Sequence, residues 1–589
     1  MHSLDIGPKL LCCNNSNATA CEKLGTLACK NCLMVTYCSK RCQIAHWRTH
    51  RTHCKSPLMM ETWHPSSITA KARMSCICGS GSDDGPGMPN LWGNVPAVDV
   101  VQLGQNEGIG FREPIRVLFP ASGDIRNTIF SVTSLPLSYQ SLFTIVLNDP
   151  DIDIVARNLL FLWIFFVEDN AAAAAEHVLH VWYSALVTES CYSMLCGKLK
   201  PFVEQVCNKI TQKSGPTLLS KTWKFGECFL RLVLTRDDWF SLLSYFDIPL
   251  GLSKDTAQRV RQSIVSAPQR ITYWESVMCT KSPTGRVAMG KFCRDGLLLP
   301  FGQSRLPFTI PNPTLFHFRR GWPIMDTADP VDGWPMKSVL GFDIGPAKND
   351  VYGKLYHYLK HLFADFHRRL RSLPVAFTLS RVDVQLLPKS LTEKQFDRID
   401  VGNICDKAYL GINITLQTFG PLLQPVSVNP HAKLVTLFRD AVADAKNICD
   451  AISNIVDIPF KESLDVQAEK IVPYMPGLRE ELQDTDRWRN GIVKIARGIR
   501  LVYDMDGLFN WFVLTHGLLR FADVALNAGV EMKATHTIVD AWPMKFQGGM
   551  STEQAKQDFA LLLSSNHTGQ QRYVEWKVGA ERPVEDVDE

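Results

Sequence analysis

Residues able to bind a metal gather near the start of the chain, where eight of the eighteen cysteines lie between residues 12 and 54. Cys29-x2-Cys32 is a tight thiol pair, and Cys38-x3-Cys42 places two more thiols one helical turn apart. His50-x3-Cys54 follows on a spacing that also suits a helix. Zinc prefers four soft or borderline ligands in a tetrahedron, and a closed shell of Cys and His is typical of a structural site. The pattern therefore predicts two zinc ions with eight ligands.

The segment from Tyr37 to Cys54, YCSKRCQIAHWRTHRTHC, resembles the MYND zinc finger, whose signature is Y-C-S-x2-C-Q followed by W-x2-H-x3-C. The resemblance implies interleaved ligands: one zinc ion on Cys12, Cys21, Cys38 and Cys42, and the other on Cys29, Cys32, His50 and Cys54. The first pair departs from the usual C-x2-C, because eight residues separate Cys12 from Cys21. Cys12 and Cys13 therefore compete for the first position. We favour Cys12, because fungal variants of the finger begin with Leu-Cys and carry a longer first loop.

In the MYND family the finger binds short proline-containing peptides, using a Gln and a Trp that match Gln43 and Trp47 here. Lys30 stands where peptide-binding members often have Ser, so the peptide specificity does not carry over. His46 and His53 are expected to be polar helix residues and not ligands. The finger is basic, but its positive charges are scattered and no aromatic stacking platform is evident, which disfavours nucleic acid as the partner.

The whole chain has the composition of a globular protein, with 46% hydrophobic and 21% charged residues over 589 positions. A net charge of +4 gives no case for a membrane or a nucleic acid as the main partner. The longest apolar run, from Leu159 to Val167, is far shorter than the roughly 20 residues that span a bilayer. No export signal precedes the finger, so we expect an intracellular protein, cytoplasmic or nuclear, with reduced cysteines.

Four domain-scale segments are expected: the finger at 1–57, a Gly/Ser-rich linker at 58–90, an α/β domain at 91–440, and a mainly helical region with an acidic tail at 441–589. A helical insertion of about residues 160–380 would interrupt the α/β domain. Short apolar runs ended by turn residues predict its strands. These runs are Ile115 to Phe119, Leu142 to Leu147, Val375 to Leu387, Phe396 to Val401 and Lys433 to Phe438.

The predicted fold class is thus α/β with large helical content, with a core that resembles a degenerate Rossmann or methyltransferase domain. In S-adenosylmethionine methyltransferases a glycine-rich turn follows the first strand, and an acid after the second strand holds the ribose. Here the turn contains only Gly123, and Asp149 stands at the acid position. A single glycine is a weak signal, so a structural turn is favoured over a cofactor site. Gly402 and Asn403 lie where methyltransferases place a substrate-side loop.

Residues of about 90–440, including LWGNVPAVDV from Leu91 and FDRIDVGNICDKAYLG from Phe396, resemble a fungal domain that follows a MYND finger. The same domain is found at the front of dynein axonemal assembly factors, which act in the assembly of protein complexes. No G-x-S-x-G, H-E-x-x-H or Walker-type loop is present. Trp322, Trp334 and Trp542 sit beside Gly or Pro, and covering the core is their expected role.

These observations favour a zinc-binding protein-interaction or adaptor protein over an enzyme. Its expected partners are other proteins, with proline-containing peptides as candidates. The first alternative is an S-adenosylmethionine-dependent methyltransferase of unknown substrate, using residues around Gly123 and Asp149. The second is a DNA-binding transcriptional regulator, and the basic finger is the only feature that supports it.

Overall fold

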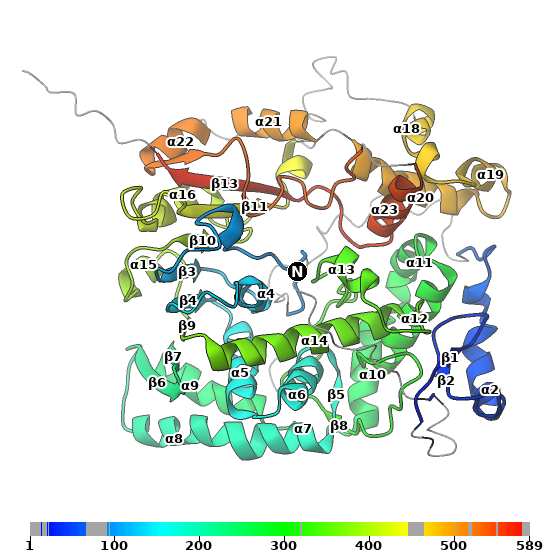
Figure 1. The fold of residues 1–589 in the computed structure, drawn as a ribbon, viewed down its shortest axis with the longest axis horizontal. Helices are drawn as coiled ribbons and strands as arrows, with labels where there is room; N and C mark the ends of the chain where they lie inside the picture. The colour runs from blue at the N-terminus through cyan, green and yellow to red at the C-terminus, as the bar shows by residue number, and fades with distance from the viewer. Residues whose placement is uncertain are drawn as a thin grey trace, which may run out of the picture.

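This computed structural model contains a mixed sheet of nine strands, which lies on the left side of the view in Figure 1. The structure describes residues 13–14, 21, 23–65, 91–93, 95–317, 321–445, 464–503, 505–515, 521–548 and 552–579. The strands of the sheet are β3 (Ile115–Phe119), β4 (Phe143–Asn148), β6 (Leu219–Phe225), β7 (Cys228–Leu234), β9 (Val375–Ser380), β10 (Arg398–Asp400), β11 (Lys433–Phe438), β12 (Val530–Met532) and β13 (Arg572–Val578).

Their order is β12-β13-β11-β10-β3-β4-β9-β7-β6. The six strands from β11 to β7 are parallel to one another, whereas β13 and β6 are antiparallel to their neighbours. All residues of β4 and β11 are buried, as expected for central parallel strands, which are covered on both faces. Such nearly continuous apolar runs are what makes the strands recognisable in the sequence.

Helices cover both faces of the sheet (Figure 1). Ile115 and Ile145 on one face belong to a core that includes four helices packed along the sheet, and Leu118 and Val146 on the other face belong to a core that includes four more. The first group is α4 (Arg126–Ser134), α5 (Ile152–Val167), α6 (Ala171–Tyr183) and α14 (Val351–Ser372). The second group is α15 (Leu387–Ser390), α16 (Gly411–Phe419), α21 (Asp506–Thr515) and α22 (Phe521–Asn527). The run from Leu159 to Val167 is the buried second half of α5, as expected.

The segment between β4 and β9 is the predicted insertion, and most of it is helical. Its remaining helices are α7 (Glu189–Met194), α8 (Lys200–Ile210), α9 (Arg236–Ser241), α10 (Lys254–Val265), α11 (Ile271–Cys279), α12 (Pro283–Asp295) and α13 (Met336–Gly341). A small sheet joins β5 (Leu186–Val187) to β8 (Ile310–Pro311). The hairpin of β6 and β7 was not expected within this insertion, and it extends the main sheet beyond β9.

The sheet also extends past residue 440, where the sequence predicts a mainly helical region. β13 pairs with β11 over six residue pairs, and β12 pairs with the outer edge of β13. This region also contains helices, as expected. Besides α21 and α22 they are α18 (Leu464–Ile471), α19 (Leu478–Gln483), α20 (Trp488–Val502) and α23 (Thr552–Leu563). The last strands of the chain are therefore part of the α/β core. None of the described helices is long and apolar enough to cross a membrane.

The N-terminal finger is a hairpin followed by one helix. Strands β1 (Leu27–Ala28) and β2 (Thr36–Tyr37) pair in antiparallel fashion, and helix α2 (Lys40–Cys54) leads into the short turn η1 (Pro57–Met59). Ser39 caps α2, because its side chain accepts a hydrogen bond from the amide of Cys42. The linker predicted at 58–90 begins within the described residues, but residues 66–90 lie outside them.

Candidate metal centres and the surface around them

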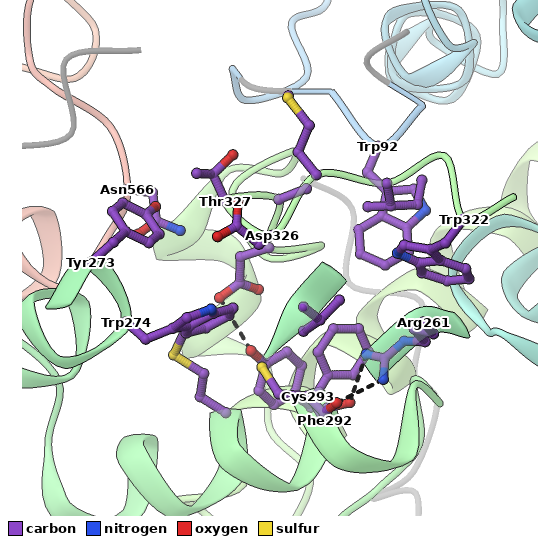
Figure 2. A pocket seen from close by; sticks show the side chains of 17 residues that line it. Trp92, Arg261, Tyr273, Trp274, Phe292, Cys293, Trp322, Asp326, Thr327 and Asn566 are labelled. Carbon is purple, nitrogen blue, oxygen red and sulfur yellow. Dashed lines mark hydrogen bonds between the residues drawn. The ribbon is translucent and has the colours of Figure 1, made fainter. Parts of the chain in front are cut away.

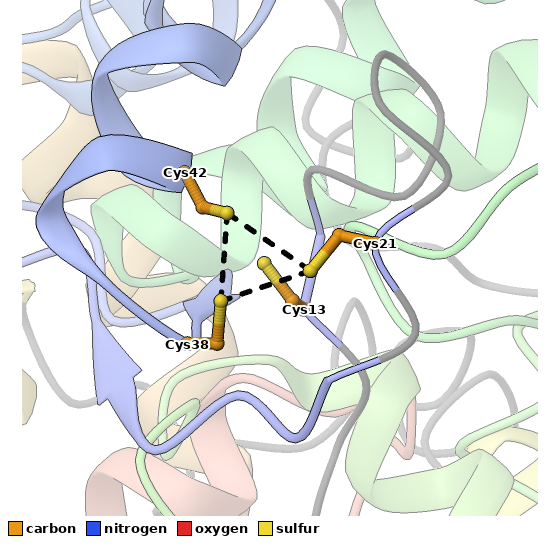
Figure 3. A group of neighbouring side chains, drawn as sticks. All are labelled: Cys13, Cys21, Cys38 and Cys42. Carbon is orange, nitrogen blue, oxygen red and sulfur yellow. Dashed lines mark hydrogen bonds between the residues drawn. The ribbon is translucent and has the colours of Figure 1, made fainter.

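The first group of ligands brings together Cys13, Cys21, Cys38 and Cys42 (Figure 3). The Sγ–Sγ distances are 3.7 Å from Cys21 to Cys38, 3.4 Å from Cys38 to Cys42 and 4.0 Å from Cys42 to Cys21. A tetrahedral zinc ion with Zn–S bonds of about 2.3 Å separates its sulfur ligands by about 3.8 Å. The thiols therefore already have the spacing that a zinc ion requires.

The structure places Cys13 in this group, and the choice of Cys12 stays a prediction. The amide of Cys13 donates to the carbonyl of Lys23 at 2.8 Å, and the next amide, of Asn14, donates to Thr36 at 2.9 Å. These bonds hold Cys13 beside the finger's hairpin and position its thiol with the other three. Cys12 lies outside the described residues. Sequence spacing alone could not separate two adjacent cysteines, because the choice depends on the path of the loop.

The second group contains Cys29, Cys32, His50 and Cys54, and all four are buried. The Sγ atoms of Cys29 and Cys54 are 3.8 Å apart, and His50 Nε2 lies 3.5 Å from Cys32 Sγ. Burial lowers the pKa of His50 to about 4, which keeps the imidazole neutral and able to donate its lone pair to a metal. Burial also raises the pKa of Cys32 far above its ordinary value, so zinc must displace a proton there.

A residue that the sequence did not single out supports this second group. The side-chain amide of Asn31 donates to Cys54 Sγ at 3.1 Å and to the Cys54 carbonyl at 3.0 Å. Such outer partners orient ligands and stabilise the thiolate charge. In the sequence, only the position of Asn31 between Cys29 and Cys32 indicated that it could have this role. The two remaining histidines of α2 have other roles: His46 Nδ1 lies 2.9 Å from the Tyr37 hydroxyl, and His53 packs against Phe301.

The exposed side of α2 carries the two residues expected to bind peptides. Trp47 is 36% exposed, and Gln43, one turn earlier, is half-buried. The Trp47 ring meets the His50 ring edge-on at 5.9 Å between centroids. One side of the Trp47 ring therefore packs against the zinc ligand His50, and the other side of the ring faces solvent. Ile44 beside it is 66% exposed.

The finger is packed onto the rest of the protein, as Figure 1 shows on the side of α11 and α12. Asn349 binds the turn after Cys32, a ligand of the second group. Its backbone amide donates to the carbonyl of Leu33 at 3.0 Å, and its side-chain amide donates to the carbonyl of Cys32 at 3.2 Å. Arg286 of α12 donates to the carbonyls of Leu58 and Met60 at 2.9 and 2.8 Å. The buried cysteines of the finger belong to the same apolar core as α12 and α14.

The glycine turn of the α/β core lies at the carboxyl end of β3. Gly123 has φ +53°, and its amide donates to Asp149 Oδ2 at 3.0 Å. The other carboxylate oxygen of Asp149 accepts from the amide of Asp151 at 3.0 Å. Burial raises the pKa of Asp149 to about 7. Both oxygens of the candidate ribose acid thus bind the protein's own backbone. Asn403, which follows the neighbouring strand β10, donates to Asp406 at 3.3 Å.

Beside this turn, Arg126 ties two distant loops together. Its guanidinium binds Asp124 at 2.8 Å, the Val95 carbonyl at 2.6 Å and the Gly333 carbonyl. It also lies 5.9 Å from the ring of Trp334. Both members of the charged pair are buried, with side-chain exposures of 8% and 6%. The Arg126 guanidinium therefore fills the space beside Gly93 and Gly333, whereas a Cβ added at Gly123 would meet no atom within 4 Å.

The three tryptophans that were expected to cover the core are buried: Trp322 is 1% exposed, Trp334 0% and Trp542 7%. Trp322 lines a cavity of about 20 Å³ together with Trp92 and Arg261 (Figure 2). Arg261 stacks on Trp322 and donates to the last carbonyls of α12. A cavity of this size holds about one water molecule. The expected covering role is confirmed, and the cavity has no room for an organic ligand.

Comparison with known families agrees with the metal geometry. The model of the MYND finger matches residues 12–54, and the model of a domain of unknown function, DUF4470, matches residues 91–187. No curated protein and no solved structure matches the chain. The N-terminal region is thus a MYND finger whose two ligand groups fit two zinc ions. MYND fingers mediate protein–protein interaction, which makes this region a zinc-binding interaction module.

Proposed function

We propose that this protein is an intracellular adaptor, cytoplasmic or nuclear, that docks partner peptides through its MYND finger. The exposure of Trp47 carries the proposal. The finger is held on the body through Asn349 and Arg286, yet this tryptophan stays on the solvent side. Exposed aromatic side chains on a rigid support are efficient anchors for a partner, because little side-chain entropy is lost on binding.

Replacing Trp47 by alanine tests this role. Fluorescence anisotropy of a panel of labelled proline-containing peptides measures binding to the zinc-loaded full chain. We expect W47A to weaken the tightest peptide by at least tenfold, which is a usual loss for an aromatic anchor. The zinc content should remain two. Unchanged peptide binding would reject the docking role, and loss of zinc in W47A would instead make Trp47 part of the metal site's structure.

We propose further that the α/β core is a degenerate relative of the nucleotide-binding and methyltransferase class, and that it serves as a scaffold. The strand order supports this kinship: the chain runs outward from β3 to β4 and β9, then returns to the other side of β3 with β10 and β11. Ligands of such sheets bind at the carboxyl ends of the strands, where the order reverses. At that point Asp149 is bound to backbone amides and Arg126 joins two loops. The resemblance to dynein axonemal assembly factors also favours a scaffold.

Isothermal titration with S-adenosylmethionine and its demethylated product tests the scaffold against the methyltransferase. The full chain is required, because β13 completes the sheet and a fragment ending near residue 440 would lack it. We expect no binding at micromolar concentrations, since Asp149 is buried and both of its oxygens already accept hydrogen bonds from backbone amides. Micromolar binding that is lost in Asp149→Ala would overturn the scaffold and identify a cofactor site.

A further inference from the structure

The finger carries a high density of positive charge that described acidic residues of the rest of the chain do not neutralise through ion pairs. Its described residues 23–55 include seven lysines and arginines and no acid: Lys23, Lys30, Lys40, Arg41, Arg48, Arg51 and Lys55. Two zinc ions on seven thiolates and one neutral imidazole would together carry −3, so the finger keeps a net charge of about +4. None of the seven forms an ion pair with another described residue.

Three of these cations form a stripe: Arg41 and Arg48 lie on α2, and Lys55 is the cap residue that follows its last turn. Arg41, Arg48 and Lys55 are seven residues apart, which is close to two helical turns, so they project from nearly the same side. All three are exposed. Trp47 lies about 100° around the helix from Arg48, which makes the stripe a surface separate from the proposed peptide-docking face.

The stripe leads to a pocket where the finger meets the body. This pocket of about 310 Å³ is lined by Thr52, His53 and Ser56 from the finger, with Leu58, and by Val287 and Arg294 from α12. Its lining contains no acid. Asp295, the residue after Arg294, already binds Lys291 at 2.7 Å and Arg305 at 3.1 Å. Arg294 is exposed and forms no ion pair with a described residue.

We propose that this stripe and pocket bind an extended acidic segment of a partner protein, which is recognised jointly by the finger and by Arg294 of the body. The cations of the stripe are about 10.5 Å apart along the helix. A segment in the extended polyproline II conformation advances about 3.1 Å per residue and has three residues per turn, so every third side chain projects from the same side and can meet a cation. The segment has carboxylates at that spacing, and its end places one of them in the pocket beside Arg294. Charge complementarity of this kind gives specificity and faster association.

The test compares two labelled peptides of the same composition by fluorescence anisotropy with the zinc-loaded full chain. One peptide has glutamates at every third position between Ser and Ala residues, and the other has the same glutamates in one block. We expect the spaced peptide to bind at least threefold more tightly, with affinity that falls as salt rises. Equal affinity of the two peptides would overturn the proposed extended path along α2.

Charge reversals locate the site. The double variant Arg48→Glu/Lys55→Glu should weaken the spaced peptide about tenfold, whereas the matched double reversal Lys213→Glu/Lys221→Glu should leave it unchanged, because those exposed lysines lie by strand β6 at the far edge of the sheet (Figure 1). Arg294→Glu should weaken it by at least threefold. No effect of Arg294→Glu would refute the joint recognition by finger and body.

Two further measurements distinguish the proposed acidic-peptide site from the proline-peptide face and from a nucleic-acid surface. W47A should bind the spaced acidic peptide as well as the parent does, so failure of the proline-peptide proposal and failure of this one are distinguishable. Single-stranded oligonucleotide is the competing ligand. If oligo-dT binds more tightly than the spaced peptide and loses its binding in Arg48→Glu/Lys55→Glu, the stripe is a nucleic-acid surface and the proposal fails.

Discussion

Replacing His50 by alanine is expected to reduce the zinc content from two ions to one and to destabilise more than the finger. The change leaves three buried thiols without their fourth ligand. A structural zinc ion contributes on the order of 10 kcal/mol to the folding of a small finger. Asn349 binds the carbonyl of Cys32 and the carbonyl of Leu33, so the loss should reach the start of α14. Elemental analysis gives the zinc content, and thermal unfolding of the full chain gives the stability.

His53→Ala is the matched control, because it removes a histidine from the same helix that is not a ligand. It should retain both zinc ions. The first group is tested in the same way, by comparing Cys13→Ser with Cys12→Ser. We expect only Cys13→Ser to lose a zinc ion, since Cys13 is the thiol placed beside Cys21, Cys38 and Cys42. Two zinc ions in His50→Ala or in Cys13→Ser would refute the corresponding ligand.

Replacing Arg126 by alanine is expected to lower the free energy of unfolding by about 3–5 kcal/mol, the usual cost of removing one member of a buried ion pair. Asp124 would remain buried without its partner, and the carbonyls of Val95 and Gly333 would lose a donor. The double variant Asp124→Asn/Arg126→Met removes both charges and should lose less than Arg126→Ala alone. Urea unfolding measures both changes.

The loss in Arg126→Ala should also depend on pH. Burial already raises the pKa of Asp124, and Arg126 is the main group that opposes the rise. Without Arg126 the pKa of the folded carboxyl rises further above that of the unfolded chain, about 3.9. The loss relative to the parent therefore grows as pH rises above the pKa of Asp124 in the folded parent, because the folded variant keeps a proton that the folded parent releases. A loss that is the same at pH 5 and pH 8 would contradict this explanation.

The elements that sequence reasoning recovered are those with strong local signals. Ile115–Phe119 and Lys433–Phe438 are nearly continuous apolar runs bounded by turns, and both are strands with those bounds. The hairpin of β6 and β7 was missed because β6, LSKTWKF, is an edge strand with exposed polar residues in place of a buried run. β13 has alternating polar residues, and its partners β11 and β12 both lie far from it in the sequence.

The residues of the candidate site also divide into those with a strong local signal in the sequence and those without one. The MYND ligands were predictable because metal chemistry demands particular residues at close spacing. Cys13 was not separable from Cys12, because the choice rests on hydrogen bonds to Lys23 and Thr36. Asn349 and Arg286 could not be found at all, since hundreds of residues separate them from the finger that they hold. Contacts of this kind carry no local pattern.

The pairing of β11 with β13 has a consequence for the way the protein is made. β11 ends at Phe438 and its partner begins only at Arg572, so a nascent chain exposes the hydrogen-bonding edge of β11 while the ribosome adds the residues between. At roughly 5–20 residues per second, that interval lasts on the order of ten seconds. An uncovered apolar strand edge is a template for aggregation. Efficient production in the cell should therefore depend on a chaperone that shields the unfinished sheet until β13 emerges.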